Sequence, residues 1–115
     1  MHDIINFRKL SWDENPLHVE SDVAKQSQFQ KPIVHGMLVA SMFSALIGNK
    51  VHGAIYLTQS FKWTLPVLVG DTITARVEVL GLKSLRSKTI ATMKTTCVNQ
   101  DLRVVLDGQA TCLLP

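Results

Sequence analysis

The 115-residue chain lacks the compositional extremes that mark several classes of protein. Charged residues make up 18% and hydrophobic residues 46% of the sequence, a balance typical of a globular domain and too apolar for intrinsic disorder. There is no run of lysine or arginine, and the net charge of +3 is spread along the chain, which argues against nucleic acid as a partner. A phosphate-bearing ligand would suit this mild positive charge. The length predicts a single domain over residues 1–115.

Cysteines and long apolar runs are equally scarce. Cys97 and Cys112 lie in expected strands without metal-ligand spacing, so we interpret them as reduced, buried residues of a cytoplasmic protein, with a disulfide between them as the alternative. The longest apolar run, about eleven residues within 37–47, is too short to span a bilayer. The first ten residues also lack the apolar segment of a secretory signal. The sequence therefore predicts no membrane association.

Several common catalytic and metal-binding motifs are absent. The chain has no glycine-rich phosphate loop, no GxSxG nucleophile motif and no cysteine–histidine nucleophile pattern. No pair of histidine, cysteine, aspartate or glutamate residues has the spacing typical of metal ligands, so we predict no metal. Any chemistry must then come from acid–base groups and backbone donors.

The first third of the chain has helical periodicity interrupted by a proline. Ile4, Phe7 and Leu10 lie at helical spacing and predict a short helix over 3–10. The segment 11–16 ends this helix, because its Asn-Pro pair favours an extended backbone before the proline. Ser21 is a plausible N-cap for a second short helix that runs to about residue 27.

A third helix, expected over 36–47, is apolar nearly all round. From Met37 to Ile47 its only polar residues are Ser41 and Ser44. A helix with so little polar surface is expected to be buried, with other structure wrapped around it. Gly48 is a natural residue to end it.

The rest of the chain alternates apolar and polar residues in the two-residue period of β-strands. Four strands are expected, over 54–64, 72–80, 89–98 and 102–114. The first carries an apolar row of Ile55, Leu57, Phe61 and Trp63. Turn residues, among them Gly81, separate the strands, and Gly108 suggests a bulge in the last one. The sequence therefore predicts an α+β fold, in which an antiparallel meander or a close variant is wrapped around the central helix.

The polar segment 13–18 contains the clearest candidate for chemistry. Asp13 and His18 are close in sequence on a loop constrained by Asn15 and Pro16. A carboxylate and an imidazole that share one water can deliver hydroxide to one carbon and a proton to its neighbour. The alternative is structural, with Asp13 capping the turn and His18 lying on the surface. Spacing alone favours that alternative.

Four other polar or small residues are weaker candidates. The N–H of Gly36, at the start of the buried helix, could bind an oxyanion, or the glycine could simply allow chain and sheet to pass closely. Ser44 could face the site or bond back to the carbonyl of Ala40. Gln59 could line the site or satisfy a local backbone group. His35 precedes the helix, and a structural hydrogen bond is its expected role.

Taken together, these segments resemble a known family. The stretches DENPLH, FQKPIVHGMLVASMFSALIG and IYLTQSFKWTLPVLVGDTITARVEV are similar to the MaoC-like, hydratase-2 family, and within it to the short (R)-specific enoyl-CoA hydratases of polyhydroxyalkanoate synthesis. The resemblance covers nearly the whole chain. It implies the hot-dog fold, an antiparallel sheet wrapped round a long helix, and a homodimer whose sheets join edge to edge.

The resemblance also implies a role for individual residues. Asp13 and His18 fall on the catalytic aspartate and histidine, and Asn15 on the asparagine that holds their loop. The N–H of Gly36 falls on the group that binds the thioester carbonyl, and Ser44 on a helix serine close to the aspartate. The implied reaction is reversible syn hydration of a trans-2-enoyl-CoA, with no cofactor beyond the coenzyme A of the substrate.

The sequence departs from the family pattern in two places. Trp12 replaces a residue that is usually glycine, and we expect it to narrow or reshape the mouth of the site. Family members also carry a first strand before the residues that match Asp3, and this strand is expected to be missing here. An open sheet edge would invite pairing with another chain.

Two rival functions follow from the same resemblance. A thioesterase of the same fold commonly carries its carboxylate on the long helix, but Met37 to Ile47 contains none. A non-catalytic acyl-thioester-binding subunit is favoured only by the expected missing strand. Chain-length preference, pathway and the choice between coenzyme A and acyl carrier protein are left open, although residues between Leu17 and Phe29 are candidates for closing the acyl tunnel.

Overall fold

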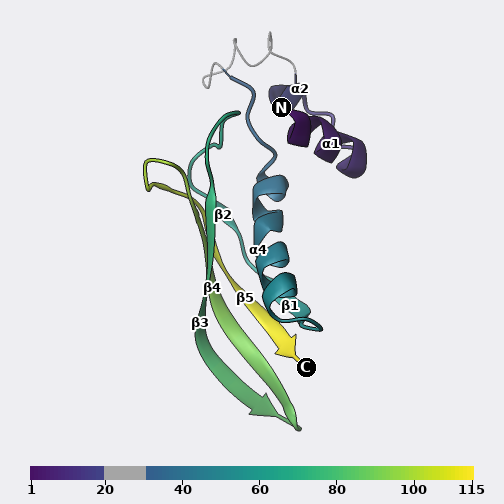
Figure 1. Cartoon of the computed structure of the whole chain (residues 1–115), viewed down its shortest axis with the longest axis vertical. Coiled ribbons are helices and arrows are strands. Elements are labelled where there is room, and N and C mark those ends of the chain that lie inside the picture. Colours follow the sequence, from purple (N-terminus) through teal and green to yellow (C-terminus); the bar gives the residue numbers. More distant parts are fainter. Residues whose placement is uncertain (20–30) are drawn as a thin grey trace.

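The computed structural model describes residues 1–19 and 31–115, and its elements follow the expected order of helices before strands. The helix expected over 21–27 lies outside the described residues. The first helix is confirmed, and a short helix stands where the loop around His18 was expected. The elements are α1 (His2–Ser11), α2 (Pro16–Val19), α4 (Gly36–Lys50), β1 (Ile55–Gln59), β2 (Lys62–Trp63), β3 (Thr74–Leu85), β4 (Lys88–Val98) and β5 (Val104–Leu114) (Figure 1).

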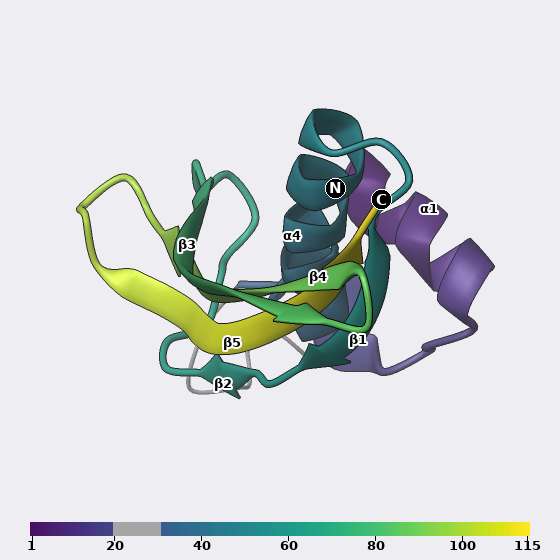
Figure 2. The same ribbon diagram turned by 90° about the horizontal axis from the view of Figure 1, so that it is seen from below.

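The strands form one antiparallel sheet with the order β1-β5-β4-β3, and β2 also pairs with β5. β3, β4 and β5 make a meander, while β1 lies on the far side of β5, so the close variant of a meander is confirmed. Within the described residues β3 forms one edge of this sheet. The sheet curls around α4, with β3 on one side of the helix and β1 on the other (Figure 2).

The core lies between α4 and the inner face of the sheet. Val39, Ala40, Phe43 and Ile47 are the buried residues of the helix. Phe43 packs against buried side chains of β4 and β5 in one cluster, and Ile47 packs in a second cluster nearer the helix C-terminus. α1 and α2 lie beyond the N-terminal end of α4, so the polar segment between them is held beside the first turn of α4 (Figure 1).

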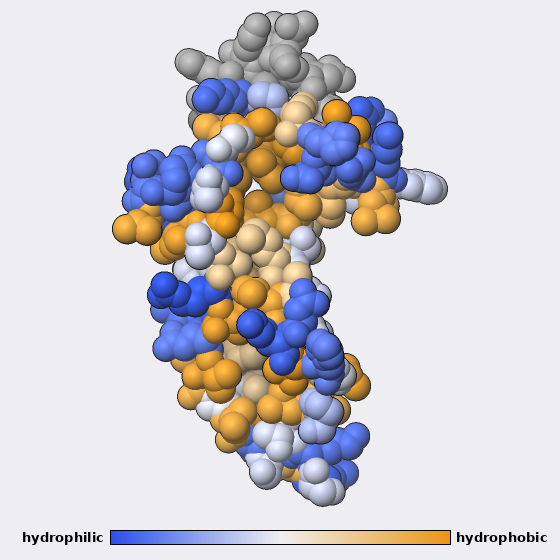
Figure 3. All heavy atoms as spheres, in the orientation of Figure 1, coloured by the Kyte–Doolittle hydropathy of each residue, from blue (hydrophilic) through white to orange (hydrophobic). Residues whose placement is uncertain are grey.

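α4 differs from the sequence prediction in where it ends and in how fully it is buried. Gly48 does not end the helix, which passes through it in helical conformation and continues to Lys50. The helix is also not covered on every side. Met37 is 54% exposed, and Ser41, Ser44 and Ala45 are exposed as well. The sheet covers only one face of α4, and apolar atoms remain visible along the middle of the view in Figure 3.

The segment expected as one strand over 54–64 is two strands with a break at Ser60 and Phe61. A register shift between Tyr56 and Thr58 reverses which side chains face inward. Tyr56 is therefore half-buried, whereas Ile55 and Leu57 are exposed, contrary to the expected apolar row. Which residues of this segment face the core depends on its pairing with β5, and the alternation of residues within one strand cannot determine that pairing.

Glycines in the strands also behave differently from expectation. Gly81 does not form a turn, because β3 runs through it, with a register shift between Val79 and Gly81, and ends instead in a hairpin at Arg86 and Ser87. These two residues adopt positive φ angles of 52° and 61°. Gly108 shows no bulge and pairs regularly with Thr95. A Cβ there would collide with the carbonyl oxygen of Ser60, so close chain approach explains this glycine.

Cys97 and Cys112 are buried in β4 and β5 as free cysteines, as the sequence predicts. Burial raises the pKa of the Cys97 thiol to about 11 and also raises the pKa of the Cys112 thiol. Both thiols therefore stay protonated and are poor nucleophiles at neutral pH. Across the described part of the chain, no helix has the length and hydropathy needed to cross a membrane.

Candidate active site

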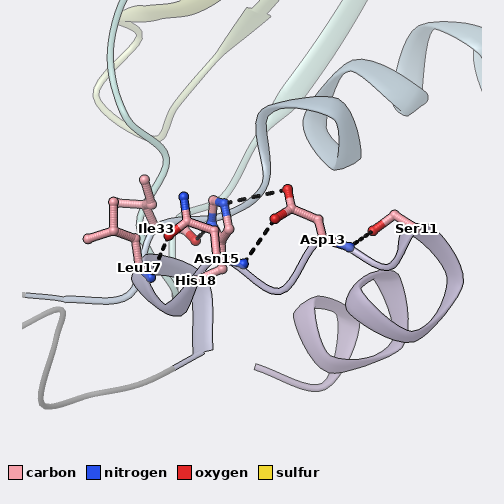
Figure 4. Close-up of polar contacts among 6 residues, drawn as sticks. All are labelled: Ser11, Asp13, Asn15, Leu17, His18 and Ile33. Atoms are coloured by element: carbon pink, nitrogen blue, oxygen red, sulfur yellow. Dashed lines mark hydrogen bonds and ion pairs between the residues drawn. The ribbon is translucent and has the colours of Figure 1, made fainter.

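The segment between α1 and α2 is held by a chain of short-range hydrogen bonds. The backbone N–H of Asp13 donates to Ser11 Oγ (3.2 Å), and that of Asn15 donates to Asp13 Oδ1 (3.1 Å). The backbone N–H of Leu17 then donates to Asn15 Oδ1 (3.1 Å), which fixes the first turn of α2 (Figure 4). Asp and Asn side chains commonly stabilise turns in this way. Asn15 therefore holds the loop, and Oδ2 of Asp13 is left to face His18.

His18 is buried at 8% exposure and belongs to α2, so the expected loop position and the surface alternative are both wrong. Its Nδ1 lies 2.6 Å from the carbonyl oxygen of Ile33. A carbonyl oxygen can only accept, so Nδ1 carries the hydrogen and Nε2 of the neutral ring carries a lone pair. Nε2 lies 4.0 Å from Asp13 Oδ2 (Figure 4). The fold therefore brings the two expected catalytic side chains face to face.

His35 has a larger part in the site than its sequence position indicated. It is 1% exposed, and neither ring nitrogen has a hydrogen-bond partner among the described residues, so the expected structural hydrogen bond is not observed. Its ring stacks on His18, with centroids 3.8 Å apart and planes at 23°, and it also contacts Phe7. The ring therefore restrains the orientation of His18. Its place before a buried helix was the one signal for this role in the sequence.

Asp13, His18 and His35 place potential ligand atoms within 4.8 Å of one another, a proximity that spacing in the sequence did not reveal. The geometry is poor for a metal. An ion must lie near the plane of each coordinating ring, whereas two stacked rings direct their lone pairs alongside each other instead of toward one point. Nδ1 of His18 is also engaged by Ile33. The residues present therefore do not fit a metal centre.

Gly36 begins α4, and its N–H has no acceptor within the helix. The positive end of the helix dipole adds to this donor. The indole of Trp63 lies directly over Gly36, because a Cβ built on the glycine would be 2.6 Å from Trp63 Nε1. Close approach is therefore one reason for the glycine, and the donor role is compatible with it. The sequence placed Trp63 in the apolar row of its strand but not at the site, because its contact with Gly36 joins two segments far apart in the chain.

Two other candidate residues, Ser44 and Gln59, make no contact with this group among the described residues. Ser44 is exposed two turns along α4 from Gly36, about 12 Å of helix rise, and has no hydrogen bond to Asp13 or Ala40 among the described residues. Neither expected contact of Ser44, with the aspartate or with Ala40, is therefore observed among the described residues. Gln59 bonds to Tyr56, Ser60 and Thr95 inside the sheet, so the local structural alternative holds.

Trp12 does not narrow the site as expected. Its side chain is 85% exposed and is not among the residues that line the cavities around Asp13 and His18. The residue instead ends α1 with a left-handed backbone at φ 65°. This conformation favours glycine, which explains the usual glycine of the family pattern.

We expect His35 to make stability depend on pH. Burial lowers the pKa of His35, a charged His18 lowers it further, and Asp13 acts in the opposite direction. As the pH falls through about 6.5, His35 of the unfolded chain takes up a proton. His35 of the folded chain is still neutral at that pH, because its pKa is lower. The stabilisation is present above this pH and is lost as the pH falls toward the folded pKa of His35.

The matched variant is His35→Phe, which keeps an aromatic ring between His18 and Phe7 but cannot titrate. Free energies of unfolding from urea titrations between pH 5 and 8 should fall more steeply toward acid in the native chain than in the variant. Parallel curves would show that His35 contributes nothing to this dependence.

Comparisons with known proteins agree over almost the whole chain. Residues 1–101 match the family model described as MaoC like domain. An (R)-specific enoyl-CoA hydratase of Aeromonas caviae is 44% identical over 115 residues, which cover 98% of this chain and 84% of that protein. A mitochondrial 3-hydroxyacyl-acyl-carrier-protein dehydratase of tomato, Solanum lycopersicum, is 41% identical over 98% of this chain and 68% of its own length.

A solved structure gives the same result for the fold. The (R)-hydratase from A. caviae, described as involved in polyhydroxyalkanoate biosynthesis, superposes with a TM-score of 0.93 at 44% identity. The match covers 99% of this chain and 86% of that structure. The antiparallel sheet curled around one helix is therefore shared with a solved hydratase.

Proposed function

The chain belongs to the MaoC-like domain family, and from this premise we propose that it is an (R)-specific enoyl-CoA hydratase. It would convert a trans-2-enoyl-CoA reversibly to an (R)-3-hydroxyacyl-CoA, which makes it a hydro-lyase with a hot-dog fold. The observation that carries this proposal is the pairing of Asp13 Oδ2 and His18 Nε2, 4.0 Å apart beside the N-terminus of α4. The pair has the two groups that hydration of an activated double bond requires.

The reacting water belongs between Asp13 and His18. Both Oδ2 of the carboxylate and Nε2 of the neutral imidazole are acceptors, so they do not hydrogen-bond directly to each other. A water between them can donate one hydrogen to each, which leaves its oxygen lone pairs free to attack. As the oxygen bonds to C3, one of these acceptors takes the proton, and the same pair returns a proton to C2. Because both groups lie on one side of the double bond, the addition is syn.

The N–H of Gly36 would stabilise the negative charge that develops on the thioester oxygen during the reaction. As the new bond forms at C3, the electron pair of the C2–C3 double bond shifts into the C1–C2 bond, and the carbonyl pair moves onto the thioester oxygen. The negative charge on this enolate oxygen needs a hydrogen-bond donor. The first N–H of α4 is free for that purpose and is strengthened by the helix dipole. Gly36 and Asp13 line the same cavity, so one thioester can reach both. Asn15 supports the pair indirectly, because it fixes the turn that presents Asp13.

The proposed reaction also bears on the cofactor, the pathway and the cellular location. No cofactor is needed beyond the coenzyme A of the substrate, and polyhydroxyalkanoate synthesis is one route that would consume the (R)-product. The buried free thiols suit a reducing compartment, and we propose a cytoplasmic location. Candidates for closing the acyl tunnel between Leu17 and Phe29 lie mostly outside the described residues.

We also propose that the chain acts as a homodimer. α4 is too apolar to leave half uncovered, yet Met37 is 54% exposed and an open groove lies between Met42, Leu46 and Ala75. A second copy is the simplest cover for such a surface. Sedimentation equilibrium at micromolar concentration should give twice the chain mass of 12.8 kDa. A single-chain mass under the conditions of the activity assay would contradict this proposal.

The function is tested with crotonyl-CoA and the purified chain. Hydration removes the enoyl absorbance, and chiral analysis of the product should give the (R)-3-hydroxy thioester. Release of free coenzyme A thiol, measured in the same reaction, would indicate a thioesterase instead. Binding of crotonyl-CoA with neither signal would support a non-catalytic subunit and reject the proposal.

A further inference from the structure

Two cavities meet at Gly36, and each contains one member of the catalytic pair. The first, about 310 Å³, holds Asp13 together with Ser11 and His35. The second, about 300 Å³, holds His18. Its other walls are mainly apolar and include Ile33, Val34, Val39, Leu65, Pro66 and Val67. Gly36 and Trp63 line both cavities.

Trp63 is the side chain that stands between the two spaces. It comes from β2, where it pairs with the buried Leu106 of β5 and so points to the helix side of the sheet. Its indole covers Gly36 so closely that a side chain at position 36 would force the indole to move. Phe61 also contacts the indole, with ring centroids 5.3 Å apart. Trp63 is still 45% exposed, so it is a wall of the site and not part of the core.

Each of the two cavities suits one end of the substrate. The reacting carbons must lie between Asp13 and His18, and the thioester oxygen must reach Gly36 at the junction. The acyl chain then extends along the apolar walls of the second cavity, where burial of its methylene groups is favourable. The thioester leaves through the cavity that holds the charged Asp13 together with Ser11.

We propose that Trp63 is the specificity-determining residue of this site and limits it to short acyl chains. This inference rests on the proposed hydratase function. A volume of about 300 Å³ is at the small end of the range for ligand pockets. The indole is one wall of this cavity, so its bulk reduces the apolar space beside the acyl chain. A smaller side chain would join the two cavities and extend the apolar surface.

The test compares two substrates in three proteins. We would measure kcat/KM for crotonyl-CoA and trans-2-octenoyl-CoA with the native chain, Trp63→Leu and the control Trp12→Phe. Trp63→Leu should raise the octenoyl-to-crotonyl ratio about tenfold or more, mainly through a lower KM for octenoyl-CoA. Trp12→Phe should leave the ratio unchanged, because Trp12 lines neither cavity.

An equal loss of kcat/KM with both substrates in Trp63→Leu would overturn the inference, since it would show that Trp63 only supports Gly36. Trp63→Phe provides a milder variant should the leucine variant fail to fold, with a smaller shift of the same sign expected. Calorimetric Kd values for butyryl-CoA and octanoyl-CoA test the role of Trp63 in chain-length preference separately from the hydratase function, because binding does not require turnover. If the native chain proves inactive, the hydratase function fails, while the Kd ratio of Trp63→Leu to native still supports or rejects the role of Trp63.

Discussion

Asp13→Asn and His18→Ala are each expected to lower kcat for crotonyl-CoA hydration by about 10²- to 10⁴-fold. Asp13→Asn keeps the size of the side chain and Oδ1, which accepts the turn-forming bond from Asn15, but it removes the charge that faces His18. His18→Ala removes the Nε2 acceptor. Steady-state rates measured by loss of enoyl absorbance, with KM determined separately, would show an effect mainly on kcat, because both groups act on the reacting atoms.

The chain offers a matched control for each substitution. Asp101→Asn changes an exposed aspartate in a turn, and His52→Ala changes an exposed histidine after α4. Both controls should retain native activity. The double variant of Asp13 and His18 should be little worse than either single variant, because one water requires both groups. Activity within threefold of native in Asp13→Asn would refute the assigned mechanism.

The second large effect is expected at Gly36, where two substitutions separate the N–H from the space around it. Gly36→Ala adds a Cβ that would lie 2.6 Å from Trp63 Nε1, so the indole must move. Gly36→Pro imposes the same crowding and also removes the N–H. Proline is tolerated at the first position of a helix, and the extended backbone of His35 (φ −55°, ψ 128°) suits a residue before proline.

The proline variant should therefore be about 10²- to 10³-fold slower in kcat than the alanine variant, the usual effect of losing one oxyanion donor. Circular dichroism would verify that α4 is intact in both. Gly48→Ala is the control within the same helix, because its Cβ would meet no other atom within 4 Å. It should leave activity unchanged and stabilise the chain by roughly 0.5–1 kcal/mol. Equal rates in the proline and alanine variants would exclude the Gly36 N–H as the donor.

Local patterns in the sequence were sufficient for most of the secondary structure. The spacing of Ile4, Phe7 and Leu10 located α1, and the apolar run after Gly36 located α4. The turn that presents Asp13 was also predictable, because the bonds among Asp13, Asn15 and Leu17 join residues only two apart. Such features depend on neighbours along the chain, which the sequence lists directly.

Strand phase and strand ends were less predictable. Alternation placed Ile55 and Leu57 on the inner face, but a register shift against β5 turned Tyr56 inward instead. Gly81 resembled a turn residue, yet pairing with β4 carried β3 past it. In each case hydrogen bonds to a distant strand outweighed a weak local preference, because register is set by the partner strand and the buried face together.

The sequence by itself determined the fold class, and its resemblance to the MaoC-like family singled out Asp13, His18 and Gly36 as the candidate acid–base pair and donor. Only the tertiary structure decided how these groups are surrounded: His35 stacks on His18, and Trp63 covers Gly36. Both contacts join segments that are far apart in the chain. They exist because α2 and β2 are each packed against the N-terminal end of α4, and neither helical nor strand periodicity carries information about such contacts.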